Sequence, residues 1–455
     1  MVPSLISSLF EQSLPWQKLR HRLSQNQPLT RISGLIGSGQ SLIISKIFLE
    51  HERPLICIMN DKEEAAYLLN DLEGLLGQDR VLFYPESYHR PYKLEKADNN
   101  NVLMRSEVLT HINSRKKPTL IVTHPSALFE QVVTKKTLIQ STIKLKTGEQ
   151  MDIEVLNELL FEAQFKCVDF VTEPGEFSLR GGIVDIFSYS NDHPYRLEFF
   201  EESLESIREF DIETQLSIRL KNKISIIPNV GEKSRVGSRQ SFLSYLGTDA
   251  LVIVQDQGFI IDKIDLLFNK AKEYYKSLKS PLQWPAPEEL FCNKSLINRD
   301  LNAAEKIWLL AKGDPNHDIA FGHHPQPSFN KQFHLLIDHI NANHERGMTT
   351  IICCGSEAQA RRFRDIFEDS NKEVFGYRIK VFSLYQGFYD QSEGIACYTD
   401  HQIFERYNKF KLKNDKSRKQ AISVNELSQW NIGDYITHID HGIGTFGGLQ
   451  QIQVE

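Results

Sequence analysis

The sequence lacks a long hydrophobic run, a dense set of cysteines and, in its first residues, the pattern of a secretory signal peptide. No window approaches 18 consecutive apolar residues, the length that a membrane-spanning helix needs. The first residues, MVPSLISSLFEQSLPWQKLRHR, have no basic start followed by a continuous apolar segment, so we expect no secretory signal peptide. The six cysteines form no C-x-x-C pair, which argues against a zinc site and is typical of a reduced protein. We therefore expect a cytoplasmic protein without a membrane partner.

An excess of basic residues is also absent. The chain has 53 Lys and Arg against 59 Asp and Glu, which gives a formal net charge of −6. Proteins that act mainly on nucleic acids usually carry a basic excess, so this balance argues against DNA or RNA as the main partner. The basic run KFKLKNDKSRKQ at 409–420 is interpreted as part of a solvated linker over 409–429, with a DNA contact as the alternative.

A single missing lysine is the most informative absence. Residues 34–41, GLIGSGQS, match the phosphate-binding pattern G-x-x-x-x-G-K-[ST] except that glutamine replaces the lysine. In a working loop, backbone N–H groups surround the phosphates and the lysine ammonium contacts the β- and γ-phosphates. Glutamine carries no charge, so we expect the shape of the loop to be kept and its nucleotide chemistry lost; a glycine-rich turn without nucleotide ancestry is the alternative. The residues of this degenerate loop are Gly34, Gly37, Gly39, Gln40 and Ser41.

A second incomplete motif follows the apolar run ALVIV at 250–254. Its continuation, Gln255-Asp256-Gln257, resembles a Walker B strand, in which an aspartate holds Mg²⁺ and a following glutamate often positions the attacking water. Here Gln257 stands in place of that glutamate, and an apolar strand followed by an aspartate by chance is the alternative. If both motifs are genuine, the site has lost its lysine and its second acid. We therefore expect no catalytic residue and no bound ATP or Mg²⁺ in this chain.

Hydrophobic periodicity divides the chain into α/β and α+β segments. Strand-like and helix-like runs alternate over 1–126, the pattern of a parallel sheet with crossover helices. Over 127–212 a helix-like run is followed by three short strand-like runs with turn-rich connectors, typical of an inserted antiparallel meander. Alternation resumes over 213–324 as the second part of the first domain, and 325–408 is predicted to be a small α/β domain.

The inserted meander carries the strongest signature, with EPGEFSLRGGIVDIF at 173–187 and PYRLEFF at 194–200. Strand alternation predicts a core face and an opposite face that combines an arginine, a carboxylate and an aromatic ring. The core-face residues are Tyr195, Leu197 and Phe199, and the opposite residues are Arg196, Glu198 and Phe200. Because arginine and aromatic residues are enriched at protein–protein hot spots, we interpret the opposite face as a docking surface; a solvated face with one stray aromatic is the alternative.

Three motifs make this segment resemble a known domain: R-G-G-x-x-D-I-F at 180–187, P-Y-R-x-E-F-F at 194–200 and E-S-I-R-x-F-D at 205–211. The domain is shared by the excision-repair protein UvrB and the bacterial transcription-repair coupling factor (Mfd) family. The resemblance implies that it docks onto UvrA and that the contacting residues are Arg180, Arg196 and Phe200.

The same resemblance implies that the degenerate loop belongs to a UvrB-like, RecA-like P-loop domain. UvrB keeps the loop lysine and the coupling factors do not. UvrB also carries a tyrosine-rich hairpin that grips damaged DNA, and only Tyr84-Pro85-Glu86-Ser87-Tyr88 stands near that place here. Both departures favour the coupling factors over UvrB.

The last residues favour the same family. Residues 430–455 begin with WNIGDY and continue through HGIGTF at 441–446, which looks like the opening of the RNA-polymerase-interacting domain of the coupling factors. The resemblance implies the start of a CarD/Tudor-like β-barrel and a contact with the polymerase β subunit. His438 and His441 have a spacing open to metal ligation, but no further Cys or His stands nearby, so no metal is expected.

The chain is thus interpreted as the N-terminal part of a transcription-repair coupling factor that recruits UvrA to RNA polymerase stalled at DNA damage. The resemblance implies that the whole protein is an ATP-dependent DNA translocase that displaces the polymerase. Its ATP, Mg²⁺ and DNA contacts would lie in helicase domains beyond this chain, which we predict not to be an enzyme itself. The alternative is an active UvrB-type ATP-dependent damage-verification subunit, against which Gln40 and the missing hairpin argue.

Overall fold

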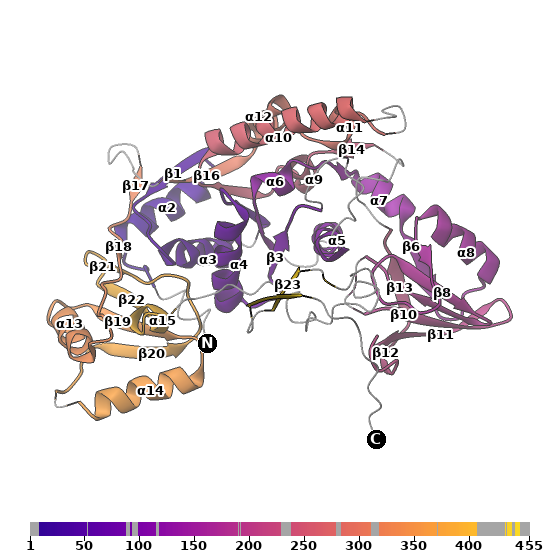
Figure 1. Ribbon diagram of the computed structural model, residues 1–455. Helices are drawn as coiled ribbons and strands as arrows, with labels where there is room; N and C mark the ends of the chain where they lie inside the picture. The colour runs from indigo at the N-terminus through magenta and orange to yellow at the C-terminus, as the bar shows by residue number, and fades with distance from the viewer. Residues whose placement is uncertain are drawn as a thin grey trace, which may run out of the picture. The chain divides into compact units, whose positions relative to one another are not determined.

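The computed structural model describes most of the chain, and its described residues fall into two units, 1–410 and 411–455. The described residues are 9–51, 53–87, 92, 99–114, 118–189, 191, 193–228, 238–278, 284–310, 318–370, 372–406, 433, 435–438 and 442–445. The predicted basic linker (409–429), Tyr88, His441 and most of the segment 430–455 lie outside them. Figure 1 shows the described elements as coloured ribbons.

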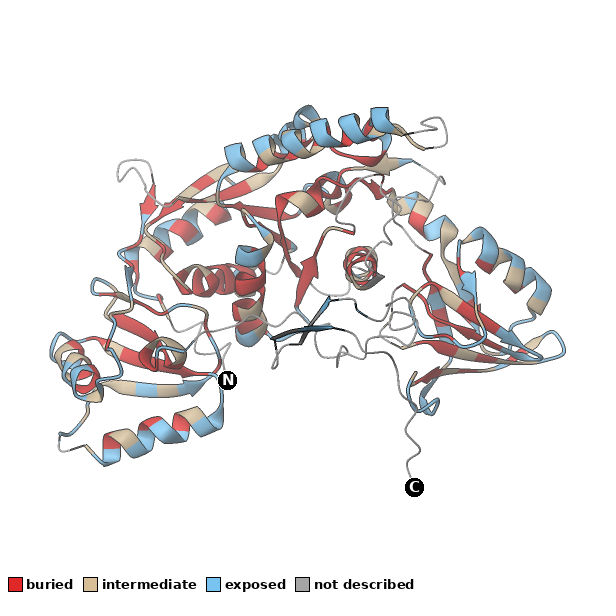
Figure 2. Cartoon of the chain, viewed as in Figure 1, coloured by how far each residue is buried: buried red, intermediate tan, exposed pale blue. Residues whose placement is uncertain are grey.

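A seven-stranded parallel sheet forms the centre of the first unit, as the alternating pattern predicted, with the order β17-β1-β16-β15-β2-β4-β3. Its strands are β1 (Leu29–Ser33), β2 (Leu55–Ile58), β3 (Val81–Tyr84), β4 (Leu120–Thr123), β15 (Leu251–Val254), β16 (Glu305–Leu310) and β17 (Ile319–Ala320). The strands β2, β3, β4 and β15 are buried along their whole length, as expected of a parallel sheet with helices on its faces, and Figure 2 shows these buried residues. The longer helices are α2 (Leu14–Ser24), α3 (Gly39–His51), α4 (Lys62–Leu76), α5 (Asn99–Ser114), α10 (Gln257–Ser277) and α12 (Lys294–Ala303).

The sheet takes strands from two distant segments. β1 pairs with β16 and β2 pairs with β15, so residues near 30 and 56 lie beside residues near 307 and 253. The chain between β4 and β15 therefore leaves the sheet and returns to it. Short elements at the exit and return are α6 (Pro125–Leu128), β5 (Val132–Val133), α7 (Lys135–Ser141), β14 (Arg239–Gln240) and α9 (Phe242–Leu246), and a further short helix, α11 (Pro287–Leu290), lies between α10 and α12.

The inserted segment forms a six-stranded sheet in the order β12-β11-β10-β9-β8-β7, antiparallel except for the pair β7–β8. Its strands are β7 (Lys166–Cys167), β8 (Glu176–Arg180), β9 (Ile183–Ile186), β10 (Tyr195–Phe200), β11 (Ser203–Phe210) and β12 (Ser217–Lys221). A helix, α8 (Ile153–Glu162), and a two-stranded sheet of β6 (Ile143–Lys146) and β13 (Lys223–Ile226) complete this inserted domain. The predicted alternation along β10 is confirmed: Tyr195 and Leu197 are buried, and Phe199 packs against the same core.

The core of the inserted domain begins and ends later than the predicted boundaries of 127–212. Leu128, Val133 and Leu138 pack into the core of the parallel sheet, whereas Ile224 and Ile226 pack into the inserted core. Beyond the predicted end at 212, the chain continues as β12 and β13. Apart from Val102 of α5, the inserted core therefore spans residues 143–226.

The small α/β domain has a five-stranded sheet in the order β18-β21-β22-β19-β20. Its elements are β18 (His324–Pro325), α13 (Phe333–Glu345), β19 (Thr349–Cys354), α14 (Glu357–Glu368), β20 (Tyr377–Val381), β21 (Phe388–Asp390), β22 (Ile395–Thr399) and α15 (Asp400–Ile403). The change of sheet falls between β17 and β18, close to the predicted start at 325.

In the second unit, β23 (Tyr435–His438) pairs antiparallel with β24 (Gly442–Thr445). The predicted CarD/Tudor-like barrel stays a prediction, as does the RecA-like assignment of the parallel sheet. Across the described parts of the chain, no helix is both long enough and apolar enough to cross a membrane.

Candidate functional site

The inserted sheet places a row of charged residues on its outward face. In the strand register, Asp185 of β9 lies beside Arg196 of β10, and Arg196 lies beside Arg208 of β11. Because side chains alternate between faces, this row points away from the core that contains Leu197 and Ile207. The register therefore brings together side chains that are far apart in the sequence.

A buried carboxylate joins the two predicted arginines. The Asp185 carboxylate is only 2% exposed and accepts hydrogen bonds from Arg196 Nε at 2.7 Å and Arg196 Nη2 at 2.9 Å. Arg180 also donates to it through Nη2, and Arg196 donates further to Gln215 at 3.0 Å. The hydrogen bond to Asp185 raises the pKa of Arg196 above its ordinary value. Arg180 and Arg196 are thus held in one arrangement rather than free in solvent.

Aromatic rings support both arginines from the side. The Arg196 guanidinium carbon lies 4.4 Å from the ring centre of Phe210, and that of Arg180 lies 5.2 Å from Phe170. Such cation–π contacts stabilise a guanidinium and fix its plane. Phe200, at the end of β10, is 69% exposed on the same outward face. The face therefore combines two oriented guanidinium groups with a large apolar side chain open to solvent.

Sequence reasoning named Arg180, Arg196 and Phe200 but not Asp185, Phe170 or Phe210. The aspartate stands in the R-G-G-x-x-D motif, so its presence was visible, but its role depends on the pairing of β9 with β10. Phe210 was predicted only as part of a strand. Neither sequence distance nor alternation within one strand shows which side chains face one another across strands.

The degenerate loop (residues 34–41) connects β1 to α3, where a phosphate-binding loop would stand. Three of its backbone N–H groups, which would face phosphates in a working loop, already have protein acceptors. Ser38 N donates to Gln386 O at 2.9 Å, Gly39 N to Ile36 O at 3.1 Å, and Gln40 N to Gly37 O at 3.3 Å. These three donors are therefore satisfied without a nucleotide.

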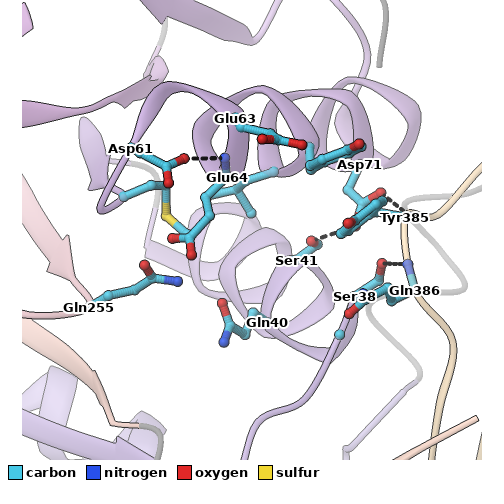
Figure 3. Close-up of a pocket in the computed structure, with 14 residues that line it drawn as sticks. Ser38, Gln40, Ser41, Asp61, Glu63, Glu64, Asp71, Gln255, Tyr385 and Gln386 are labelled. Atoms are coloured by element: carbon cyan, nitrogen blue, oxygen red, sulfur yellow. Dashed lines mark hydrogen bonds between the residues drawn. The ribbon is translucent and has the colours of Figure 1, made fainter. Parts of the chain in front are cut away.

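A cavity of about 440 Å³ lies beside the loop (Figure 3). Among the described residues, those that line it include four carboxylates and no lysine or arginine. The carboxylates are Asp61, Glu63, Glu64 and Asp71. Figure 3 shows Gln40 on the same side of the cavity as Gln255. Phosphate groups would meet negative charge here with no cation to neutralise them, which is the opposite of a nucleotide site.

The hydroxyl of Ser41, which would reach Mg²⁺ in a working loop, is engaged by a buried aspartate. Ser41 Oγ donates to Asp71 Oδ2 at 2.7 Å, and the backbone N–H of Tyr385 donates to Asp71 Oδ1 at 2.6 Å. Burial raises the pKa of Asp71 to about 6, although hydrogen bonds from Ser38, Ser41 and Tyr385 oppose the shift. The magnesium-binding position is therefore used for a structural contact.

The predicted Walker B residues do not reach this cavity. Asp256 is the N-cap of α10, where its carboxylate accepts a hydrogen bond from Phe259 N at 2.9 Å. The Gln257 side chain donates a hydrogen bond from Nε2 to Asn302 Oδ1 and accepts one at Oε1 from Lys306 Nζ. The residue of this segment that lines the cavity is Gln255. Asp256 thus has a structural role as a helix cap, because an aspartate at an N-cap accepts a hydrogen bond from an otherwise unpaired helix N–H.

The C-terminal histidine pair is only half described. His438 lies in β23, and His441 lies outside the described residues. Within the described residues, no group of three or more His, Cys, Asp or Glu side chains is placed to hold a metal ion.

The raised pKa of Asp71 predicts a stability change with pH. Its folded pKa is about 6, whereas an unfolded aspartate has about 3.9. Between these values the folded chain binds more protons, so this contribution to stability is complete below about pH 4 and is lost as the pH rises through about 6. The shift corresponds to roughly 3 kcal/mol. The Asp71→Asn variant should remove this slope, since its side chain does not titrate.

Urea unfolding of the wild type and Asp71→Asn at pH 4, 5, 6 and 7 measures this difference. As the pH rises from 4 to 7, the wild type should lose the contribution of Asp71, whereas the variant has none to lose. The free energy of unfolding of the variant minus that of the wild type should therefore increase by roughly 3 kcal/mol from pH 4 to pH 7. Glu63→Gln, an exposed carboxylate on the same helix, is the matched control and should show no such increase. Parallel pH profiles for the wild type and Asp71→Asn would refute the assignment.

Two family models match parts of this chain. The UvrB interaction domain matches residues 143–231, which coincide with the inserted core at 143–226. The CarD-like/TRCF RID domain matches residues 430–455. The first match covers the outward face with Arg180, Arg196 and Phe200, and the second covers the hairpin of β23 and β24.

The chain is also similar to transcription-repair-coupling factors along nearly its whole length. The one from Bacillus subtilis (strain 168) is 22% identical, and the alignment covers 99% of this chain and 44% of the relative. Those from Staphylococcus aureus strains USA300 and bovine RF122 / ET3-1 are 21% and 22% identical with the same coverage. This chain therefore spans less than half the length of these relatives. The comparisons confirm the predicted resemblance: across 99% of its length this chain is similar to the transcription-repair-coupling factors.

Proposed function

We propose that this chain recruits UvrA through the outward face of its inserted domain, to RNA polymerase stalled at DNA damage. The observation that carries the proposal is the pair of arginines fixed by Asp185 beside the exposed Phe200, within the segment that matches the UvrB interaction domain. Arginines held in place and an exposed aromatic ring are what interface hot spots use.

The arrangement of the arginines favours an acidic partner surface. Each guanidinium has five N–H donors, and a shared carboxylate does not use them all. Two positive groups around one negative group also leave an excess of positive charge. Asp185 and the aromatic rings already fix both guanidinium planes. The arginine side chains would therefore lose little conformational entropy when a partner's carboxylate binds them. Phe200 would fill an apolar pocket of the partner beside this contact.

Phe200→Ala is the sharpest test of this surface. The ring is largely exposed, so we expect the free energy of unfolding to change by less than about 0.5 kcal/mol. Binding to purified UvrA should weaken by about 1–3 kcal/mol, a typical hot-spot loss. Arg196→Ala should weaken UvrA binding similarly and also destabilise the domain, since it leaves the buried Asp185 without its bidentate partner.

Calorimetric titration of UvrA and urea unfolding of each variant separate these two effects. Phe259→Ala, a half-exposed phenylalanine on α10, is the matched control and should bind UvrA like the wild type. Wild-type affinity in Phe200→Ala and in a folded Arg196→Ala would exclude this face as the UvrA contact.

We further propose that this chain neither binds nor hydrolyses ATP. Gln40 supplies no charge, the N–H groups of Ser38 and Gly39 have protein acceptors, as does that of Gln40 itself, and the adjacent cavity has four carboxylates in its lining. The same features argue against the alternative of an active UvrB-type damage-verification enzyme. ATP, Mg²⁺ and DNA contacts, and the ATP-dependent translocation that displaces the polymerase, would belong to parts of the longer proteins that this chain does not cover.

Titration of Mg-ATP into the chain at millimolar concentration tests this prediction. We expect no measurable heat of binding and no phosphate release above the buffer rate. Binding in the micromolar range, with turnover, would contradict the loss of nucleotide chemistry and would restore the UvrB-type alternative.

A contact with the RNA polymerase β subunit is proposed from the match of residues 430–455 to the CarD-like/TRCF RID domain. Tyr435 of β23 is 84% exposed, and exposed tyrosines are frequent interface anchors. A two-stranded sheet is marginally stable on its own, so we expect weak binding.

Tyr435→Ala should weaken capture of the isolated β subunit by about 1–3 kcal/mol. Tyr274→Ala, an exposed tyrosine on α10, should leave it unchanged. Equal capture by wild type and Tyr435→Ala, or none by the wild type, would count against this contact.

A further inference from the structure

We propose that the degenerate loop is a docking site for the small α/β domain, and that a segment of that domain now occupies the place where phosphates would bind. The segment is residues 383–387, between β20 and β21, and is called the docking loop below. The proposal gives a role to a motif that the UvrA-binding function does not use.

Two hydrogen bonds join the docking loop to the degenerate loop. Ser38 N donates to Gln386 O at 2.9 Å, and Gln386 N donates to the side-chain hydroxyl Oγ of Ser38 at 3.0 Å. The backbone of Gln386 thus both accepts from and donates to Ser38. A backbone carbonyl therefore lies at Ser38 N, where a phosphate oxygen would bind. Figure 3 shows the second contact, between Gln386 N and Ser38 Oγ.

Two side chains on α4 complete the docking site. Tyr67 stacks on Tyr385 with ring centres 3.6 Å apart and an interplanar angle of 19°. Asp71 accepts the backbone N–H of Tyr385 at 2.6 Å and also binds Ser41 of the degenerate loop. Asp71 thus connects the two loops through one buried carboxylate.

The glycines of the motif fit this packing. A Cβ at Gly37 would lie 3.0 Å from both Cβ and O of Gln386, and one at Gly39 would lie 2.2 Å from Nδ1 of His323. Real Cβ atoms essentially never approach other atoms to 2.2 Å, so a side chain at Gly39 would displace the buried His323 ring. Gly37 also has φ of +54°, which favours glycine. Gly37 is therefore favoured by the close approach of the docking loop, and Gly39 by the close approach of His323 from the connection between β17 and β18, without any phosphate.

Hydrogen bonds within the small domain hold the docking loop in shape, independently of its contacts with the degenerate loop. His401 Nε2 lies 2.9 Å from Tyr385 O, and Gly387 N donates to Gln402 Oε1 at 2.6 Å. Both partners stand in α15 of the small domain. A preformed loop loses little conformational freedom on docking, which favours a persistent contact between the domains.

Hydrogen exchange of the whole chain tests the docking. The amides of Ser38, Tyr385 and Gln386 should be protected in the wild type, because each has a protein acceptor. Tyr385→Ala removes the stack on Tyr67 and should speed exchange in peptides covering 36–39 and 384–387 about tenfold, as local opening becomes more frequent. Amides in β15 and β19 should stay as slow as in the wild type, which shows that both sheets remain folded.

Phe375→Ala, a half-exposed aromatic of the small domain outside the docking loop, is the matched control and should leave these peptides unchanged. Rapid exchange of peptides 36–39 and 384–387 in the wild type would overturn the proposal. So would unchanged protection in Tyr385→Ala.

A second measurement restores the missing lysine. Gln40→Lys should still give no measurable Mg-ATP binding, because the docking loop and Asp71 occupy Ser38 N and Ser41 Oγ. Submillimolar Mg-ATP binding by Gln40→Lys would show that the loop is free, and would refute the docking role while leaving the UvrA proposal untouched.

Discussion

The parallel pairing of β1 with β16 is the contact on which the arrangement of this chain depends. It joins residues 29–33 to residues 306–310, so that the last long strand of the sheet lies beside the first. The inserted domain belongs to the stretch between β4 and β15, which leaves the sheet and returns to it. On its other side β1 pairs with β17, which puts the end of β1, and hence the degenerate loop, beside the start of the small domain. Sheet pairing therefore positions both candidate sites.

Each site is organised by one buried aspartate that accepts hydrogen bonds from two separate segments. Asp185 binds two arginines, and the outcome is a fixed, positively charged surface. Asp71 binds a hydroxyl and a backbone N–H, both neutral, so burial dominates and its pKa rises to about 6. The same residue type thus supports a charged outward face in one domain and a contact between loops in the other, because the donors around it differ in charge.

The degenerate loop keeps the glycines of a phosphate-binding loop while another segment of the chain packs against it. Glycines allow the backbone of a phosphate-binding loop to approach a ligand closely, and here Gly37 allows the backbone of the docking loop to approach instead. Gln40, which stands in place of the lysine, lines the adjacent cavity together with acidic residues of α4.

The sequence by itself determined the local features of this protein. Alternation within β10 determined which of Tyr195 to Phe200 face the core, since side chains in a strand alternate regardless of context. Apolar runs alternating with helical runs determined the parallel sheet, and the motifs determined the family resemblance. Arg180, Arg196 and Phe200 as UvrA contacts stay predictions. The tertiary structure alone decided the boundaries at 143 and 226, the role of Asp185, the capping place of Asp256 and the docking of Tyr385 on Tyr67. Each of these depends on segments that meet only after folding, and no local pattern records which segments will meet.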